Sequence, residues 1–310
     1  MLAIIVDSTA SAAHPVPEGN PEHAGRYEAV RDRMRGMDGL HWVESEPATR
    51  PQLARFHTDQ HIERVLNTCA SAEEGELIAL DWDTHVTHSS AAAALQAAGG
   101  VVLAVDRVME GPETLAFSLA RPPGHHAEPD RAMGFCLFNS IAVGALHALD
   151  ARSQDRVAII DFDVHHGNGS QVLAERDERV FFASLHQAPL YPGSGSASET
   201  GLNGNVLNIP LPEATPAAQW RATFERDVLP AIDRFEPGMI FVSAGFDAHL
   251  DDPLGGLTLR SDDYRWLGHT LAAKAREHSE GRLVAALEGG YDCPALARSA
   301  AAFVGGLQGA

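Results

Sequence analysis

Short apolar runs alternate with longer alanine-rich stretches along most of this chain, and this alternation constrains its fold more than any other feature. Strands of a parallel sheet are nearly continuous apolar runs, because helices cover both of their faces. We predict strands at Leu2–Val6, Thr114–Leu119, Val157–Phe162, Val180–Leu185, Val206–Ile209, Met239–Ser243 and Leu283–Leu287. We predict helices at Gln60–Ala70, Ser90–Met109, Ser140–Leu149, Gln219–Arg234 and Asp262–Glu277. Their order indicates an α/β fold, in which ligands bind beyond the carboxyl ends of the strands.

Ionisable side chains and glycines follow several of the predicted strands. The segments are Arg121–His126, Asp161–Gly169, Ala244–Asp247 and Glu288–Tyr291. Because the carboxyl ends of parallel strands meet at one edge of a sheet, we expect these segments to form one site. Loops that serve only solubility do not concentrate glycine and ionisable groups in this way.

Asp163 and His165 are two residues apart in an extended segment, so both side chains can address one ion. Asp247 supplies a third ligand from another strand end. Three protein ligands with an open position are typical of a catalytic zinc site, although Fe(II), Co(II) and Mn(II) accept the same donors. Taken alone, the Asp161–His166 motif also suits a capped turn in a charged loop; the other strand-end residues argue against that alternative. Two carboxylates cancel the charge of a divalent ion, which then needs help to polarise an amide.

The adjacent histidines His125 and His126 are candidates for acid–base chemistry. An imidazole with a pKa near neutrality can take a proton from water and give it to a leaving amine. Asp161 and Asn168 are available to orient the two rings through their far nitrogens. An aspartate would keep its histidine a cation, whereas an asparagine leaves its histidine easier to deprotonate. Tyr291, after two glycines, can donate a hydrogen bond to a carbonyl oxygen as negative charge develops.

The composition argues against several classes of protein. The 310 residues are 45% hydrophobic and 21% charged, which suits a chain with a large core. The net charge of −19 argues against nucleic-acid binding and favours cationic substrates, although an acidic surface also serves solubility alone. Cys69, Cys136 and Cys293 form no Cys-x-x-Cys pair, so we expect neither a disulfide framework nor a cysteine zinc site. We expect no stretch close to the ~18 apolar residues of a membrane span and no signal peptide, hence a cytoplasmic protein.

Several motifs resemble those of the histone deacetylase superfamily, which includes class II-like bacterial histone deacetylase-like amidohydrolases and acetylpolyamine amidohydrolases. The motifs are Arg121–Ala127, Gly134–Ser140, Asp161–Gly169, Ser243–Ala248, Asp252–Gly256 and Glu288–Tyr291. The resemblance extends from about Glu22 to the end and implies a single deacetylase catalytic domain over residues 1–310. It also implies the three-layer arginase/deacetylase fold, a parallel sheet of about eight strands with helices on both faces.

The resemblance implies a role for each candidate residue. The zinc ligands of the family match Asp163, His165 and Asp247. Its general base and acid, its electrostatic histidine with an aspartate partner, and its carbonyl-polarising tyrosine match His126, His125 with Asp161, and Tyr291. Asn168 is similar to class II enzymes, since class I enzymes carry aspartate there. A potassium ion is implied near Asp161, Asp163, His165, Ser184 and Leu185, and a second one at the backbone around Ala174, Asp177 and Val180.

Substrates of the family reach the metal through a narrow tunnel. Phe135, beside Gly134, and Tyr191 resemble its walls; phenylalanine is more usual than Tyr191, which leaves the polarity of the tunnel open. Leu254 stands where polyamine-selective relatives carry an acidic residue, and so resembles the lysine-deacetylating pattern. We therefore expect an acetyl-lysine or similar ε-acyl amine, presented by a small molecule or a peptide. Acetylpolyamine is the alternative substrate.

Two other functions stay open at this point. An arginase-like ureohydrolase uses two manganese ions with additional Asp and His ligands, whereas the sequence shows one compact ligand set. A non-catalytic acyl-amine binding protein would keep the fold but has no need of His126 and Tyr291. We expect no nucleic-acid or membrane partner. The sequence leaves the acyl-chain length, the native metal and homo-oligomer formation open.

Overall fold

The computed structural model describes residues 3–309, and a sheet of eight parallel strands lies at its centre. In spatial order the strands are β2 (Leu40–Glu44), β1 (Ala3–Asp7), β5 (Leu115–Leu119), β10 (Leu283–Leu287), β9 (Met239–Ala244), β6 (Val157–Asp161), β7 (Val180–Gln187) and β8 (Val206–Leu211). The predicted parallel sheet is confirmed, with small shifts at the strand ends. Leu2 of the first predicted strand lies outside the described residues.

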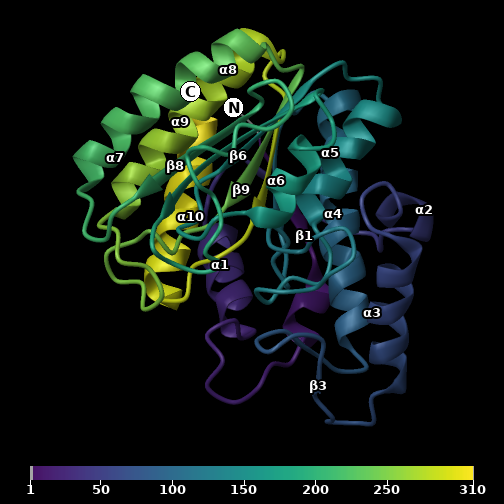
Figure 1. The fold of residues 1–310 in the computed structure, drawn as a ribbon. Helices are drawn as coiled ribbons and strands as arrows, with labels where there is room; N and C mark the ends of the chain where they lie inside the picture. Colours follow the sequence, from purple (N-terminus) through teal and green to yellow (C-terminus); the bar gives the residue numbers. More distant parts are fainter. Residues whose placement is uncertain (1–2, 310) are drawn as a thin grey trace.

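Helices cover both faces of the sheet, which forms the middle of three layers (Figure 1). One outer layer contains α3 (Asp59–Ser71), α4 (Ser90–Glu110) and α5 (Ser140–Asp150). The other contains α1 (Gly25–Arg35), α7 (Ala217–Thr223), α8 (Leu229–Phe235), α9 (Ser261–His278) and α10 (Cys293–Gln308). The short elements are α2 (Arg50–Leu53), α6 (Asn168–Ala174), a 3-10 turn at Thr9–Ala13, and a separate antiparallel pair, β3 (Ile78–Ala79) and β4 (His85–Val86).

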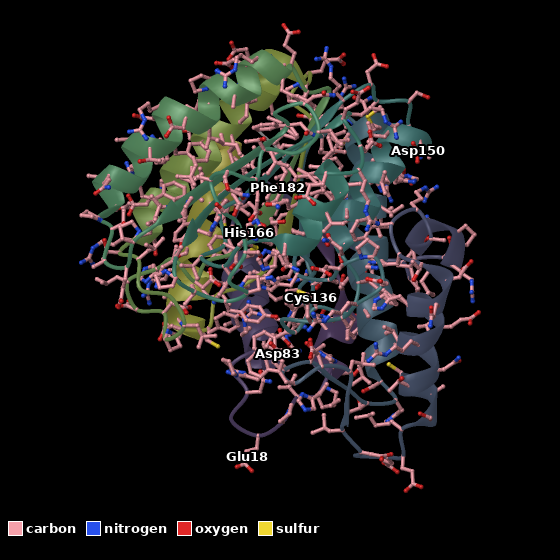
Figure 2. The ribbon with its side chains drawn as sticks, in the orientation of Figure 1. Glu18, Asp83, Cys136, Asp150, His166 and Phe182 are labelled. Carbon is pink, nitrogen blue, oxygen red and sulfur yellow. The ribbon has the colours of Figure 1, made fainter. Side chains whose placement is uncertain are left out.

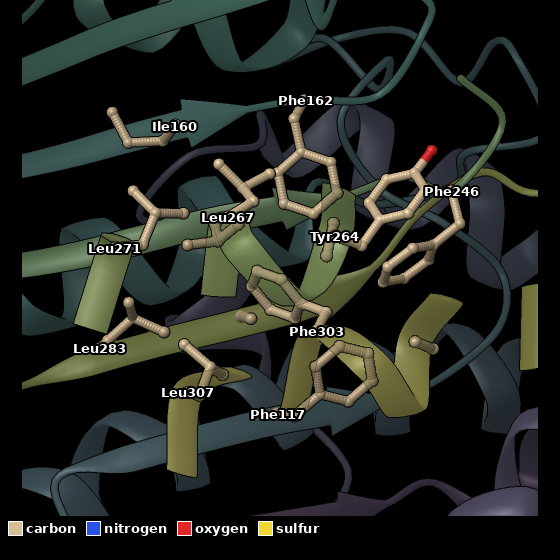
Figure 3. Close-up of a cluster of buried hydrophobic side chains, with 14 of the residues drawn as sticks. Phe117, Ile160, Phe162, Phe246, Tyr264, Leu267, Leu271, Leu283, Phe303 and Leu307 are labelled. Atoms are coloured by element: carbon tan, nitrogen blue, oxygen red, sulfur yellow. The ribbon is translucent and has the colours of Figure 1, made fainter. Parts of the chain in front are cut away.

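Each central strand is fully buried because its side chains alternate between two hydrophobic clusters. In β1, Val6 packs into the cluster under α4 and α5, whereas Ile5 packs into the cluster under α9 and α10. Figure 3 shows the second cluster, in which the Phe162 ring lies 5.3 Å from Phe303 and 5.9 Å from Tyr264 between centroids. The buried ring of Phe162 thus fixes the position of the segment that contains Asp161 and Asp163.

Some elements differ from the sequence prediction. Strand β2 and helices α1 and α10 were not predicted; β2 is a half-buried edge strand, so it lacks a continuous apolar run. The helix predicted at Gln219–Arg234 consists of α7 and α8 with a π-helical turn at Phe224–Val228 between them.

The expectation that no segment approaches the length of a membrane span is wrong for α4. An 18-residue window of Ser90–Glu110 has a mean hydropathy of 1.4, which meets that criterion by length and composition. However, 61% of this window is buried inside the molecule, where α4 packs on β1, β5 and β10. Its alanine-rich composition therefore matches its position as a covering helix of the sheet.

A buried ionic cluster connects two loops at the carboxyl edge of the sheet. Glu22 Oε1 lies 2.8 Å from Arg26 Nη1 and 2.6 Å from Arg121 Nε, and all three side chains are fully buried. Arg26 also donates hydrogen bonds to the carbonyls of Glu288 and Gly290. Burial alone would raise the pKa of Glu22, but the two guanidinium groups lower it below its ordinary value. The cluster thereby holds the loop after β5 beside the loop after β10.

Replacing Glu22 with glutamine should lower the free energy of unfolding at pH 7 by about 3–5 kcal/mol, because two buried guanidinium groups lose their counter-charge. The folded-state pKa of Glu22 lies below its ordinary value of 4.5. The stabilisation is therefore present above pH 4.5 and is lost as the pH falls through the folded-state pKa. The free energies of unfolding of wild type and Glu22→Gln, measured by denaturant titration from pH 7 to below pH 4.5, should become equal at low pH. A difference in unfolding free energy that stays constant with pH would contradict the explanation by charge.

Candidate active site

The predicted metal ligands lie together at the carboxyl edge of the sheet. Asp163 and His165 follow β6, and Asp247 follows β9, which pairs directly with β6. One donor atom from each residue lies within 4.8 Å of the others, and all three residues are buried. His165 Nδ1 is 3.0 Å from Asp163 Oδ1 and 3.1 Å from Asp247 Oδ2. Adjacent strand ends therefore bring together residues that are far apart in the sequence.

Backbone groups approach these carboxylates closely. Val164 N donates to Asp247 Oδ1 at 2.8 Å, and Gly289 N donates to Asp163 Oδ2 at 2.8 Å. A Cβ atom on Gly245 would lie 2.1 Å from Asp163 Oδ2, and one on Gly289 would lie 2.1 Å from Asp247 Oδ2. Glycine at both positions leaves room for the ligand oxygens.

The charges of this trio fit a divalent cation. Within residues 3–309, no lysine or arginine forms an ion pair with Asp163 or Asp247; His165 pairs with both. Burial and the neighbouring Asp163 raise the pKa of Asp247 to about 7, because two buried carboxylates repel each other. Carboxylate oxygen and imidazole nitrogen are donors that zinc and related divalent ions accept.

His125 is paired with a carboxylate. Its Nδ1 lies 3.0 Å from Asp161 Oδ2, and its Nε2 lies 3.8 Å from Asp163 Oδ2. Burial alone would lower the pKa of His125, but the charges of the two aspartates raise it to about 10. The ring is therefore a cation at neutral pH. Gly167 makes the pairing possible, since a Cβ atom there would lie 2.0 Å from Asp161 Oδ2.

His126 lies against His125, with 4.0 Å between ring centroids, but its partner is neutral. Its Nδ1 lies 2.9 Å from Asn168 Oδ1. Burial and the positive charges of His125 and His165 hold the pKa of His126 well below its ordinary value. The two adjacent histidines are therefore in different charge states, and the neutral His126 is able to accept a proton.

Tyr291 and His126 both line one cavity, and buried groups hold Tyr291 in place. Its backbone N donates to Asp252 Oδ2 at 2.6 Å, and the guanidinium of Arg26 lies 4.8 Å from its ring centroid. Gly290, with φ of +119°, allows the turn that presents the ring. Burial raises the pKa of Tyr291 well above its ordinary value, so the phenol keeps its proton and can donate it in a hydrogen bond.

A cavity of about 290 Å³ opens onto these residues. The predicted tunnel residues all line it, together with the candidate catalytic groups: Gly134, Phe135, Tyr191, Leu254, His126, His165 and Tyr291. The ring of Tyr191 lies edge-on to His126, with 5.0 Å between centroids. Its hydroxyl is buried, so it is not exposed to the cavity, and it has no hydrogen-bond partner among the described residues.

Four other residues line this cavity and were not predicted as part of the site, namely Pro21, Trp82, Asp83 and Leu190. Trp82 is 74% exposed, and its ring centroid lies 6.2 Å from that of Tyr191. Asp83 Oδ1 accepts a hydrogen bond from Gly134 N at 3.1 Å. In the view of Figure 2, Asp83 is drawn between Cys136 in the interior and Glu18 at the periphery. In the sequence, the sign that this loop contributes to the site is a tryptophan, Trp82, between Asp81 and Asp83.

The residues of the first implied potassium site lie on adjacent strand ends. Asp161 and Ser184 are register partners on β6 and β7, beside the other predicted residues Asp163, His165 and Leu185. The second implied site is different. The carbonyls of Ala174, Asp177 and Val180 accept hydrogen bonds from Asn205 Nδ2 at 2.7, 3.4 and 2.8 Å. An amide nitrogen carries two hydrogens, and each carbonyl oxygen has two lone pairs, so a second potassium ion at these carbonyls stays a prediction.

This chain is similar to known proteins along almost its whole length. The family model for the histone deacetylase domain matches residues 20–307. A probable deacetylase of Methanothermobacter thermautotrophicus is 39% identical over 304 residues, which cover 94% of this chain and 87% of that protein. A histone deacetylase-like amidohydrolase of Pseudomonas aeruginosa is 38% identical over 291 residues, covering 92% and 74%. The solved structure of the HDA15 HD domain matches with a TM-score of 0.89 at 31% identity, covering 99% of this chain and 91% of that one.

The eight-stranded parallel sheet between two helical layers is the arginase/deacetylase fold. The family match, with a probable deacetylase and a histone deacetylase-like amidohydrolase among the relatives, identifies the protein as a hydrolase. The family is generally metal-dependent, and the buried Asp163, His165 and Asp247 supply a candidate ligand set. The chain belongs to the histone deacetylase family.

Proposed function

We propose that the protein is a zinc-dependent amide hydrolase that removes acetyl or other short acyl groups from ε-amino-lysine-like substrates. We further propose that residues 1–310 form a single catalytic domain and that it acts in the cytoplasm. The observation that carries the proposal is the convergence of Asp163, His165 and Asp247 beside a cavity that His126 and Tyr291 also line.

Asp163, His165 and Asp247 would hold the zinc ion, and Fe²⁺ or Co²⁺ would fit the same donors. When bound, the ion supplies a Lewis acid that polarises the amide carbonyl and acidifies water. A potassium ion at the adjacent strand ends, near Asp161, Asp163, His165, Ser184 and Leu185, is part of the proposal. It would compensate the negative charge of the buried aspartates.

The protein's own groups divide the remaining chemistry. His126 accepts the proton of the attacking water and returns it to the leaving amine, a role that suits its neutral ring. His125, kept as a cation by Asp161, stabilises the negative charge that develops on the substrate. Asn168 orients His126, and Tyr291 donates a hydrogen bond to the carbonyl oxygen.

The cavity walls favour an apolar acyl-amine chain. Phe135, Leu190 and Leu254 line the cavity, and Leu254 itself offers no charge to a distal amine. The carboxylate in the lining, Asp83, already accepts a hydrogen bond from Gly134 N. This supports an acyl-lysine side chain on a small molecule or peptide as the partner, ahead of an acetylpolyamine. We propose no nucleic-acid or membrane partner, and homo-oligomer formation is compatible with the proposal.

The test is to measure turnover of an acetyl-lysine peptide beside acetylputrescine, using zinc-loaded protein with and without a hydroxamate. Peptide turnover that the hydroxamate blocks is the expected result. Turnover of acetylputrescine alone would support the proposed hydrolase activity but contradict the proposed acyl-lysine substrate. No turnover of either amide by metal-loaded protein would favour the binding-protein alternative.

The ureohydrolase alternative requires a second metal at the cavity. Within the described part of the chain, the other cluster of potential ligands is Asp233, Glu277 and His278, which is not buried. Lys274 Nζ already lies 2.9 Å from Glu277 Oε2 there. We therefore expect a stoichiometry of about one tightly bound divalent ion per chain.

Replacing Tyr291 with phenylalanine should lower kcat by about 10²–10³-fold, because one donor to the developing oxyanion is lost. The zinc content should not change, since the phenol is outside the ligand trio. Steady-state kinetics and metal analysis on the same preparation check both statements. Tyr264→Phe is the matched control, because this hydroxyl is buried but Tyr264 does not line the cavity. Equal effects of the two variants would contradict the assigned role.

A further inference from the structure

Asn168 makes more hydrogen bonds than its pairing with His126 requires. Its Oδ1 lies 2.9 Å from His126 Nδ1. Its Nδ2 donates to Glu128 Oε1 at 2.8 Å and to the His126 carbonyl at 3.2 Å, and lies 3.4 Å from Met133 Sδ. A carboxylate, a carbonyl and a thioether accept hydrogen bonds and cannot donate them. The amide is therefore held with its oxygen towards His126.

This orientation decides which ring nitrogen of His126 carries the proton. Because the amide oxygen is an acceptor, Nδ1 of the neutral ring must carry hydrogen, and Nε2 keeps its lone pair. A reversed Asn168 amide would donate to Nδ1 and move the ring proton to Nε2. A ring in that tautomer could not accept a proton at Nε2.

Among the three acceptors of the Asn168 amide, Glu128 is the anionic one and forms the shortest contact. Hydrogen bonds to a charged group are about twice as strong as those between neutral groups. The backbone of Glu128 is also held in place: its N donates to the Arg131 carbonyl at 2.9 Å, and its carbonyl lies 3.1 Å from His57 Nδ1. Glu128 lines a separate cavity of about 310 Å³ rather than the catalytic one, so it acts without contacting the substrate.

We propose that Glu128 is a positioning residue, which keeps His126 in the catalytic tautomer through the Asn168 amide. The inference rests on the proposed role of His126 as the base. It also gives a reason for a neutral residue at position 168. Asp161 contacts its histidine directly and keeps it a cation, whereas the charge of Glu128 reaches His126 through an amide that orients the ring and leaves it neutral.

The first test is Glu128→Ala in the metal-loaded full chain. We expect kcat to fall by about 10–100-fold, by analogy with the effect of removing groups that orient the ligands of a metal site. KM and zinc content should be unchanged. Glu128→Gln keeps an acceptor oxygen and should recover part of the loss. Glu175→Gln is the control: this exposed glutamate accepts a hydrogen bond from Gln171 Nε2 at 2.8 Å, and its variant should keep the wild-type kcat.

The same substitution in an Asn168→Asp background separates orientation from general structural support. A carboxylate at position 168 has two equivalent oxygens, so it needs no orientation, and it repels the charge of Glu128. Glu128→Ala should then leave kcat unchanged or raise it. An equal loss of kcat in both backgrounds, or no loss in the wild-type background, would overturn the proposal.

Nitrogen-15 NMR of the histidine rings, with the His126 signals assigned from a His126→Gln variant, tests the inference independently of turnover. Wild type should show hydrogen on Nδ1 of His126, and Glu128→Ala should show a loss of that tautomer. Hydrogen on Nε2 in the wild type, or an unchanged tautomer in Glu128→Ala, would overturn the proposal. The expected tautomers in a protein without amidase activity would support the role of Glu128 and overturn the proposed function.

Discussion

Replacing His126 with alanine should lower kcat by at least about 10²–10⁴-fold, the range for loss of a general acid–base group. His126 is the neutral imidazole beside the ligand trio, and the adjacent His125 is a cation that cannot take its place as base. Zinc content should be unchanged, because His126 is not one of the three ligands. Turnover of an acetyl-lysine peptide and metal analysis of the same sample are the measurements.

The control for this variant is His88→Ala, which removes an exposed histidine outside the cavity. It should keep the wild-type rate. Near-normal turnover by His126→Ala would refute the assigned mechanism. Loss of zinc in that variant would instead show that His126 helps to hold the metal.

Replacing Gly289 with alanine should remove most of the metal and, with it, the activity. The added Cβ atom would lie 2.1 Å from Asp247 Oδ2 and 2.5 Å from Asp163 Oδ2, so two ligand side chains would have to move. Disturbing the groups that orient metal ligands costs about 10–100-fold in affinity, and a direct clash with two ligands should cost at least as much. Competition with a chelator of known zinc affinity measures the loss.

Gly36→Ala is the matched control for Gly289→Ala. Gly36 has φ of −89°, and its nearest neighbour to an added Cβ atom is a carbonyl oxygen at 3.7 Å. This variant should keep the wild-type zinc affinity and rate. If Gly289→Ala bound zinc as tightly as wild type and kept its rate, the close contact between the Gly289 backbone and the carboxylates of Asp163 and Asp247 would not be needed for metal binding.

The sheet was predictable because the fully buried strands are continuous apolar runs. Strands β6, β9 and β10 are buried along their whole length, and each was predicted. Edge strand β2 was missed because its residues are only partly buried and its pattern is mixed. The capping signals of α10 were present in the sequence: the side chain of Asp292 accepts a hydrogen bond from Ala295 N, and proline occupies the first turn.

The metal ligands were predictable because each of them follows a predicted strand. Asp163 and His165 follow one strand and Asp247 follows another, and the carboxyl ends of parallel strands meet at one edge of the sheet. Trp82 and Asp83 were missed because they lie on a loop beside the short β3–β4 pair, which carries no strand-end signal. Glu128 was missed because its importance depends on one hydrogen bond to Asn168.

The sequence by itself determined the parallel sheet, the edge at which the site forms and the chemical types of the site residues. These follow from short-range patterns: apolar runs, i and i+2 spacing, and glycines beside ionisable groups. Only the tertiary structure decided the link from Glu22, through Arg26 and Arg121, to both catalytic loops and the hydrogen bond from Asn168 to Glu128. The physical reason is that electrostatic and hydrogen-bond energies depend on distance and burial, which are set by contacts between residues far apart in the chain.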